Sequence, residues 1–164
     1  MSAVEPADLD VDARWLPAET TTTDALRMLG AMAAGHACPR CGSDEHGMPW
    51  ARSRHGRLAA SAARSGGRLL IATRAAELGT IGVDVEGADV VLDASVVLHD
   101  DELDSPLAGD LAWAWTAKEA IVKHLGSGLR TEPASIRIRD FAVHRIPAPP
   151  GMVAALCTGA ARAR

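Results

Sequence analysis

The sequence predicts an α+β fold in two parts, and three observations support this prediction. The first half reads as strand, helix, strand, and the second half reads as strand, helix, strand, strand. Apolar residues make up 48% of the 164 residues and charged residues 23%, which is typical of a folded globular chain. A glycine turn separates the two patterns. We therefore expect an N-terminal half at residues 1–78 and a C-terminal half at residues 79–164.

The first half is predicted to contain two strands and one helix. Alternation in residues 11–18 predicts the first strand. A helix is expected to follow, with Thr22 or Thr23 as its N-cap. Glycine and proline indicate a loop at residues 36–50, and the apolar run at residues 67–73 predicts a buried strand.

The second half is predicted to carry a long helix among three strands. Residues 81–86 alternate strictly between apolar and other side chains, which predicts the first of these strands. Ser105 and Pro106 form an N-cap and first-turn pair for a helix that would run to Leu125 and end at Gly126. The last two strands are predicted at residues 135–146 and 147–158.

Net charge and cysteine count exclude several classes of protein. The formal net charge of -4 disfavours a general binder of nucleic acid or anionic membranes. No apolar run is long enough to span a membrane and no basic-apolar leader is visible, so we expect a cytoplasmic protein without membrane association. Cys38, Cys41 and Cys157 are an odd number, which favours reduced thiols, and Cys157 is expected in the core.

Two acids stand out on the first strand of the second half. Alternation places Asp84 and Glu86 on one face and Val83 and Val85 on the other. Carboxylates two residues apart on a strand are separated by roughly 6 to 7 Å and can converge on one hard cation. A half-buried strand whose acids face water explains the same pattern.

The long helix carries charged residues that also allow two interpretations. Lys118 falls inside the apolar stripe of residues 111–125, where its stem can pack while its ammonium reaches outward. Glu119 and Lys123 have the spacing of an ordinary helix ion pair. Together with the two strand acids, these residues also form a set suited to holding Mg²⁺ and phosphate oxygens.

Three stretches of the sequence resemble motifs of a known family. "GVDVE" followed about thirty residues later by "WTAKEAIVKHLGSGL" resembles the signature pair of the 4′-phosphopantetheinyl transferases. "CPRCGSDEHGMP" is similar to a stretch of the larger, Sfp-type members in which CxxCG is followed by HGKP. The resemblance covers the chain from Cys38 to Thr158 and implies an Sfp-type member with a shortened N-terminal half.

The resemblance implies both a fold and an activity. It implies two pseudo-twofold-related α+β halves with coenzyme A and Mg²⁺ between them. Asp84, Glu86 and Glu119 would be the metal ligands. The catalytic residues would be Glu119, which removes a proton from the acceptor, and Lys123, which neutralises phosphate charge, while Lys118 would line the same cleft. The 4′-phosphopantetheine arm would pass to a serine of an apo acyl or peptidyl carrier protein of fatty-acid, polyketide or nonribosomal peptide synthesis, and 3′,5′-ADP would leave.

The implied coenzyme side departs from the family pattern. Met48 stands where the family's HGKP motif has its lysine. Ala63 and Arg64 stand where the family has the serine and histidine of S(L/I)SHSG, and a guanidinium is well suited to replace that histidine at a phosphate. The implied coenzyme-binding residues are His46, Met48, Arg64, Ser65, Lys118 and Lys123.

Other arginines are candidates for binding, and an ordinary solvated arginine is the alternative explanation for them. Arg27 and Arg14 are candidate phosphate contacts in the shortened half. Arg130, Arg137 and Arg139 are candidates for a basic patch that docks an acidic carrier protein.

Two alternative functions stay open. A degenerate family member would keep the fold and the acids, and would bind a nucleotide or a partner protein without transferring the arm. A small zinc-dependent binding module is the other, because His36, Cys38, Cys41 and His46 are four possible zinc ligands.

Overall fold

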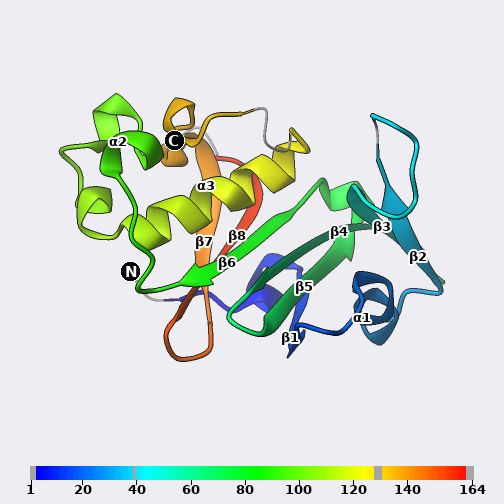
Figure 1. Cartoon of the computed structure of the whole chain (residues 1–164). Coiled ribbons are helices and arrows are strands. Elements are labelled where there is room, and N and C mark those ends of the chain that lie inside the picture. Colours follow the sequence, from blue (N-terminus) through cyan, green and yellow to red (C-terminus); the bar gives the residue numbers. More distant parts are fainter. Residues whose placement is uncertain (1–2, 39, 128–130, 162–164) are drawn as a thin grey trace.

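The computed structural model of the chain describes residues 3–38, 40–127 and 131–161, and it confirms the α+β fold class (Figure 1). The strands are β1 (Asp12–Pro17), β2 (Ala33–Ala37), β3 (Met48–Ser53), β4 (Gly56–Ser65), β5 (Arg68–Ala75), β6 (Gly82–Gly87), β7 (Phe141–Ile146) and β8 (Met152–Ala160). The α-helices are α1 (Thr22–Met28), α2 (Ala94–Val97) and α3 (Leu111–Leu125). Short 3₁₀ helices are η1 (Pro6–Leu9), η2 (Ala76–Leu78), η3 (Asp100–Glu102), η4 (Pro106–Gly109), η6 (Pro133–Ser135) and η7 (Ile138–Asp140).

The strands form two antiparallel sheets. The first sheet has the order β1-β5-β4-β3-β2, and the second has the order β6-β8-β7. Figure 1 shows α3 lying across the second sheet, while α1 lies beside the first. Each helix therefore covers apolar residues that its own sheet would otherwise expose to water.

Apolar clusters hold these elements together. Leu26 of α1 packs with Ile71 of β5, and Ile121 of α3 packs with Ala155 of β8. The layer between the two sheets contains residues of β4, β5, β6 and β8, including Leu70, which is fully buried. Burial of these side chains is the main favourable contribution to folding. The two sheets thus share one core.

Polar contacts also join the two sheets. The hydroxyl of Ser61 on β4 accepts a hydrogen bond from the amide of Val83 on β6 at 3.0 Å. Arg74 on β5 is 8% exposed and donates to backbone carbonyls of the segment leading into β6 and of β8. Its acceptors are the oxygens of Leu78, Gly79, Thr80 and Thr158.

The first half contains more strands than the sequence predicted. β2, β3 and β4 were not predicted, and the predicted loop at residues 36–50 holds the end of β2 and the beginning of β3. The N-cap of α1 is Thr21, whose hydroxyl accepts from the amide of Asp24 at 3.1 Å, so the expectation of Thr22 or Thr23 was wrong.

The second half differs from the prediction at its boundaries. Ser105 caps the short helix η4, and α3 begins after a second cap at Asp110. The predicted end of α3 is confirmed, since Gly126 has a left-handed φ of 66°. The predicted strand at residues 135–146 begins only at Phe141, after two 3₁₀ turns, and the last strand begins at Met152. No helix in the described parts of the chain has the length and apolar character needed to cross a membrane.

Candidate active site

Strand β6 places one acid directly against α3. Val83 and Val85 face the core between the sheets, so Asp84 faces the helix. Gly82 shares the face of Asp84, and a Cβ there would overlap the backbone carbonyl oxygen of Ala120 in α3. The absence of a side chain at this glycine therefore allows the close approach that brings Asp84 to the helix.

The ammonium of Lys123 joins three elements of the fold. Nζ lies 2.7 Å from Oδ1 of Asp84 on β6 and donates to the carbonyl oxygen of Ala62 on β4 at 3.2 Å. The side chain of Lys123 is 32% exposed, whereas that of Asp84 is 12% exposed. The pair therefore lies at an edge, within reach of a ligand, where α3 meets both sheets.

Two carboxylates share this one lysine. Burial raises the pKa of Asp84, and the ion pair with Lys123 opposes that change only in part. Burial also raises the pKa of Glu119, the negative charge of Asp84 raises it further, and Lys123 lowers it. The site thus has an excess of negative charge that a proton or a metal cation would relieve.

Glu86 is turned toward the first sheet. Its Oε1 accepts hydrogen bonds from the hydroxyl of Ser65 at 3.0 Å and from the amide of Gly87 at 2.8 Å. Ser65 is the last residue of β4. A predicted metal ligand and a predicted coenzyme-binding residue are therefore in direct contact.

The three predicted magnesium ligands are neighbours that do not converge on one point. Asp84 is close enough to interact electrostatically with both Glu86 and Glu119. Within the described structure, however, the oxygens of these three carboxylates do not all lie within 4.8 Å of one another. Mg²⁺ takes oxygen ligands and usually keeps several waters, so the donor set fits this ion chemically. Ligation by these three residues stays a prediction.

Lys118 lies away from the three predicted magnesium ligands, in the interior on another side of α3. Its side chain is 0% exposed, and Nζ lies 2.6 Å from Oε2 of Glu102 in η3. No regular hydrogen bond from this ammonium to another group is found in the described structure. The predicted contact of Lys118 with coenzyme A stays a prediction that its buried position does not support.

Glu102 is the residue that the sequence analysis missed. It lies in an acidic run at residues 100–104. The signal for it was Lys118 in the apolar stripe of its helix, because a buried lysine indicates a buried acid as its partner. Its carboxylate also accepts from the amides of His99 at 3.1 Å and Ile138 at 2.7 Å. Burial would raise the pKa of Glu102, but the contact with Lys118 and these amides outweigh it and lower the pKa.

Arg64 is held by the first half itself. Its guanidinium donates to the carbonyl oxygens of Ala18 at 3.2 Å and Thr20 at 2.9 Å, and to the hydroxyl of Thr22 at 3.3 Å. These contacts fix the turn that leads into α1. Arg64 is nevertheless exposed, next to Ser65 on β4.

His46 lies in the loop before β3, and Met48 is the first residue of that strand. The side chain of Met48 is against the end of α3, because a Cβ on Gly126 would lie 3.1 Å from the Met48 sulfur. His46 contacts Cys41, with Nε2 3.3 Å from Sγ. The first half therefore reaches the end of α3 with a neutral side chain where the family pattern has a lysine.

The arginines proposed for carrier docking are partly engaged. Nε of Arg137 and a terminal nitrogen of Arg139 lie 3.3 Å and 2.6 Å from Oδ2 of Asp101, and both arginines are largely exposed. Arg130 lies outside the described residues. Exposed ion pairs are weak, so the two arginines can exchange Asp101 for another acid.

The arginines proposed for the shortened half are on its surface. Arg27 forms an ion pair with Asp24 one turn earlier in α1, at 3.1 Å. Arg14 is exposed on β1. Both are accessible, and neither lies in the contact between Lys123 and Asp84.

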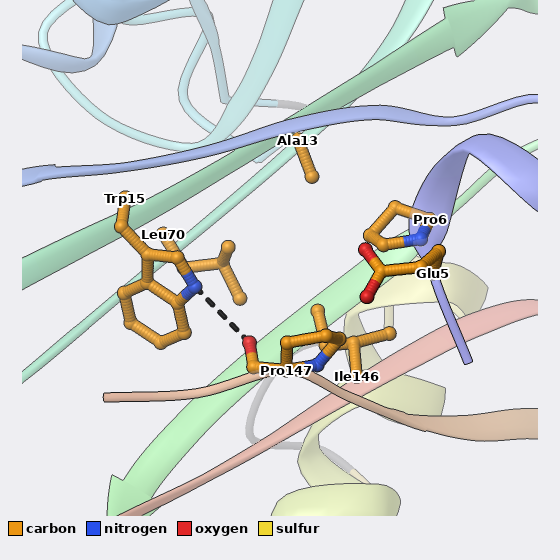
Figure 2. Close-up of a pocket in the computed structure, with 7 residues that line it drawn as sticks. All are labelled: Glu5, Pro6, Ala13, Trp15, Leu70, Ile146 and Pro147. Carbon is orange, nitrogen blue, oxygen red and sulfur yellow. Dashed lines mark hydrogen bonds between the residues drawn. The ribbon is translucent and has the colours of Figure 1, made fainter. Parts of the chain in front are cut away.

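A cavity of about 120 Å³ lies away from these residues, between β1 and the end of β7 (Figure 2). The indole Nε1 of Trp15 donates to the carbonyl oxygen of Pro147 at 3.2 Å along its wall. The residues that line it are Glu5, Pro6, Ala13, Trp15, Leu70, Ile146 and Pro147. No residue of the candidate active site is among them.

Comparison with known proteins identifies the family. The model of the 4′-phosphopantetheinyl transferase superfamily matches residues 80–163, which is more than half of the chain. The chain therefore belongs to the 4′-phosphopantetheinyl transferase superfamily, and the match includes Asp84, Glu86, Glu119 and Lys123. No curated protein matches the chain. The family's general chemistry is the transfer of phosphopantetheine from coenzyme A to carrier proteins.

Proposed function

We propose that the protein transfers the 4′-phosphopantetheine arm of coenzyme A to a serine of an apo carrier protein in a Mg²⁺-dependent reaction. We place it with the larger, Sfp-type members, in a form with a shortened N-terminal half. The observation that carries the proposal is the contact of Lys123 with Asp84 beside Glu119. It puts a cation and two carboxylates at the edge where α3 meets both sheets.

The proposed reaction joins the serine Oγ to the phosphorus that carries the pantetheine arm. The bond from that phosphorus to 3′,5′-ADP breaks, and the serine proton passes to Glu119, directly or through a water. The raised pKa of Glu119 suits this role, because a base with a pKa nearer neutrality accepts a proton more readily. Asp84, Glu86 and Glu119 would hold the Mg²⁺, which supplies charge neutralisation at the diphosphate when bound.

Lys123 is proposed to neutralise the phosphates of coenzyme A. Its ammonium already bridges β6 and β4, and the side chain is partly exposed. A phosphate oxygen can therefore accept a hydrogen bond from the ammonium without unfolding of the site. Such charge stabilisation provides most of the catalysis in phosphoryl-type transfer.

Arg64 and Ser65 are the proposed coenzyme contacts of the first half. They end β4, beside Glu86, and the guanidinium of Arg64 is suited to bidentate phosphate binding. His46 in the β2–β3 loop and Met48 at the start of β3 would border the same region, where Met48 reaches the end of α3.

Mass spectrometry of carrier proteins tests the proposal. The chain is incubated with coenzyme A, Mg²⁺ and several apo carriers, and the carriers are weighed for a phosphopantetheine adduct. Glu119→Gln should lower the rate by about 10²–10⁴-fold, the usual contribution of a general base, with an unchanged circular dichroism spectrum. Glu77→Gln is the matched control, because Glu77 is exposed and lies in η2, and it should keep the full rate.

Two results would contradict the proposal. One is the absence of an adduct on every carrier. If the protein still binds coenzyme A under those conditions, the result favours the alternative of a degenerate family member that binds a nucleotide without transferring the arm. The other is equal transfer by Glu119→Gln and Glu77→Gln, which would remove Glu119 from the reaction.

A further inference from the structure

The loop between β2 and β3 gathers three side chains that are typical metal ligands. Within the described chain, the sulfurs of Cys38 and Cys41 and a ring nitrogen of His46 all lie within 4.8 Å of one another. Sγ of Cys41 is 3.3 Å from Nε2 of His46. The two cysteines are free thiols. His36, which the sequence also offered as a ligand, is not part of this group.

Backbone hydrogen bonds shape this loop around Cys38. The amide of Gly42 donates to the carbonyl oxygen of Cys38 at 2.9 Å, and the amide of Cys38 donates to the carbonyl oxygen of Ser43 at 2.9 Å. The amides of Cys41 and Arg40 also donate to the Cys38 sulfur. Such amides stabilise a thiolate, which is the form of cysteine that binds metals.

Gly47 brings His46 onto the cysteines. Its φ of +103° is in the region that favours glycine. A Cβ at this position would lie 2.5 Å from the carbonyl oxygen of Ala37 and 2.6 Å from Cα of Cys38. The backbone of Gly47 thus packs directly on Ala37 and Cys38, which brings the adjacent His46 close to the cysteines.

The separation of Cys41 and His46 is close to that of two ligands in a tetrahedral zinc site. With Zn–S of about 2.3 Å and Zn–N of about 2.0–2.1 Å, a thiolate sulfur and an imidazole nitrogen on one zinc ion lie about 3.6 Å apart. The separation of 3.3 Å between Cys41 and His46 needs only a small adjustment. Thiolate and imidazole ligands favour zinc over Mg²⁺, so this group is chemically distinct from the acids at Asp84.

We infer that Cys38, Cys41 and His46 bind one Zn²⁺, with the fourth position facing solvent and open to water or an external ligand. The ion would stabilise the β2–β3 loop. This loop leads into Met48, whose side chain lies against the end of α3. The inference does not depend on the proposed transferase activity, because it is read out as metal content. His46 is the one residue that the two proposals have in common.

Metal analysis of the purified full-length chain tests the site. The wild-type chain is freed of metal with a chelator, given Zn²⁺ in competition with a chromophoric zinc indicator, and its bound zinc is measured by mass spectrometry. We expect one zinc per chain, lost on Cys38→Ser and on His46→Ala. His36→Ala and Cys157→Ser are matched controls that should keep one zinc per chain.

Cobalt substitution tests the ligands without any mutation. Co²⁺ in the wild-type chain should give the thiolate-to-cobalt charge-transfer band and the intense visible bands of tetrahedral coordination. Absence of these bands, or zinc bound no more tightly by wild type than by Cys38→Ser, would overturn the inference. A disulfide between Cys38 and Cys41, seen as a loss of two hydrogens in the intact mass after purification under reducing conditions, would overturn it as well.

Discussion

The ammonium of Lys118 lies 2.6 Å from the carboxylate of Glu102, and the two side chains are 0% and 7% exposed. Helix α3 packs against a sheet on one side and against η3 on another, so Lys118 is buried between them. The buried acid Glu102 compensates its charge. The pair connects α3 to the segment before it and, through the amide of Ile138, to the segment after it. This is a stability element on another side of α3 from the candidate active site.

Removing Glu102 should destabilise the fold more than removing an exposed acid does. Glu102→Ala leaves the buried ammonium of Lys118 without its partner and two amides without their acceptor, so we expect a loss of about 3–5 kcal/mol in the free energy of unfolding. Urea unfolding followed by circular dichroism measures it. Exposed Glu132→Ala is the control and should stay within about 0.5 kcal/mol of wild type. Equal losses would show that the Lys118 pair is dispensable.

The same acid should make stability depend on pH. The pKa of Glu102 is lowered below its ordinary value of 4.5, so the folded state binds fewer protons than the unfolded state near that pH. Its contribution is therefore complete above about pH 5 and is lost as the pH falls through the folded pKa. Asp84 and Glu119 have raised pKa values and act with the opposite sign.

The comparison with Glu102→Gln measures the contribution of Glu102 together with that of its partner Lys118, because both chains keep Asp84 and Glu119. Thermal unfolding from pH 7 down to pH 3 should show a steeper decline of the melting temperature for wild type than for Glu102→Gln. Parallel profiles would mean that Glu102 titrates at the same pH in both states.

Close packing at Gly82 should control both stability and activity. Gly82→Ala places a methyl group on the carbonyl oxygen of Ala120, so β6 must move away from α3 and take Asp84 from Lys123. We expect a loss of about 1–3 kcal/mol in the free energy of unfolding and a marked fall in transfer rate. Gly109→Ala is the control, since no atom lies within 4 Å of a Cβ there. Full activity in Gly82→Ala would show that this approach is not needed.

The second half could be predicted well because its signals are local. Strict alternation predicts β6 and the orientation of Asp84, and the glycine after Leu125 predicts the end of α3. The start of α3 was missed because Ser105 is a genuine cap of the short helix η4, and Asp110 then caps a second helix. Two good caps in series cannot be ranked from sequence alone.

The first half could not be predicted in the same detail because three of its strands, β2, β3 and β4, lack a clear β signal of their own. β4 is made mainly of alanine, serine and arginine, and becomes a strand because β5 and β3 pair with its two edges. The partner of Lys118 was missed for a similar reason, because Glu102 is sixteen positions earlier and reaches the helix only through the tertiary fold. The separation of Glu86 from the other acids, toward Ser65, also depends on contact between the sheets.

Cys157 should be unreactive until the protein unfolds. It is fully buried in β8, and burial raises the pKa of its thiol to about 11, so both access and thiolate are lacking at neutral pH. In metal-free protein, a chromogenic disulfide reagent should therefore label Cys38 and Cys41 rapidly and Cys157 only in denaturing urea. Peptide mapping by mass spectrometry assigns each label, and the exposed Cys41 provides the internal comparison. Rapid native labelling at Cys157 would mean that β8 opens readily from the second sheet, against the dense packing of α3 on that strand.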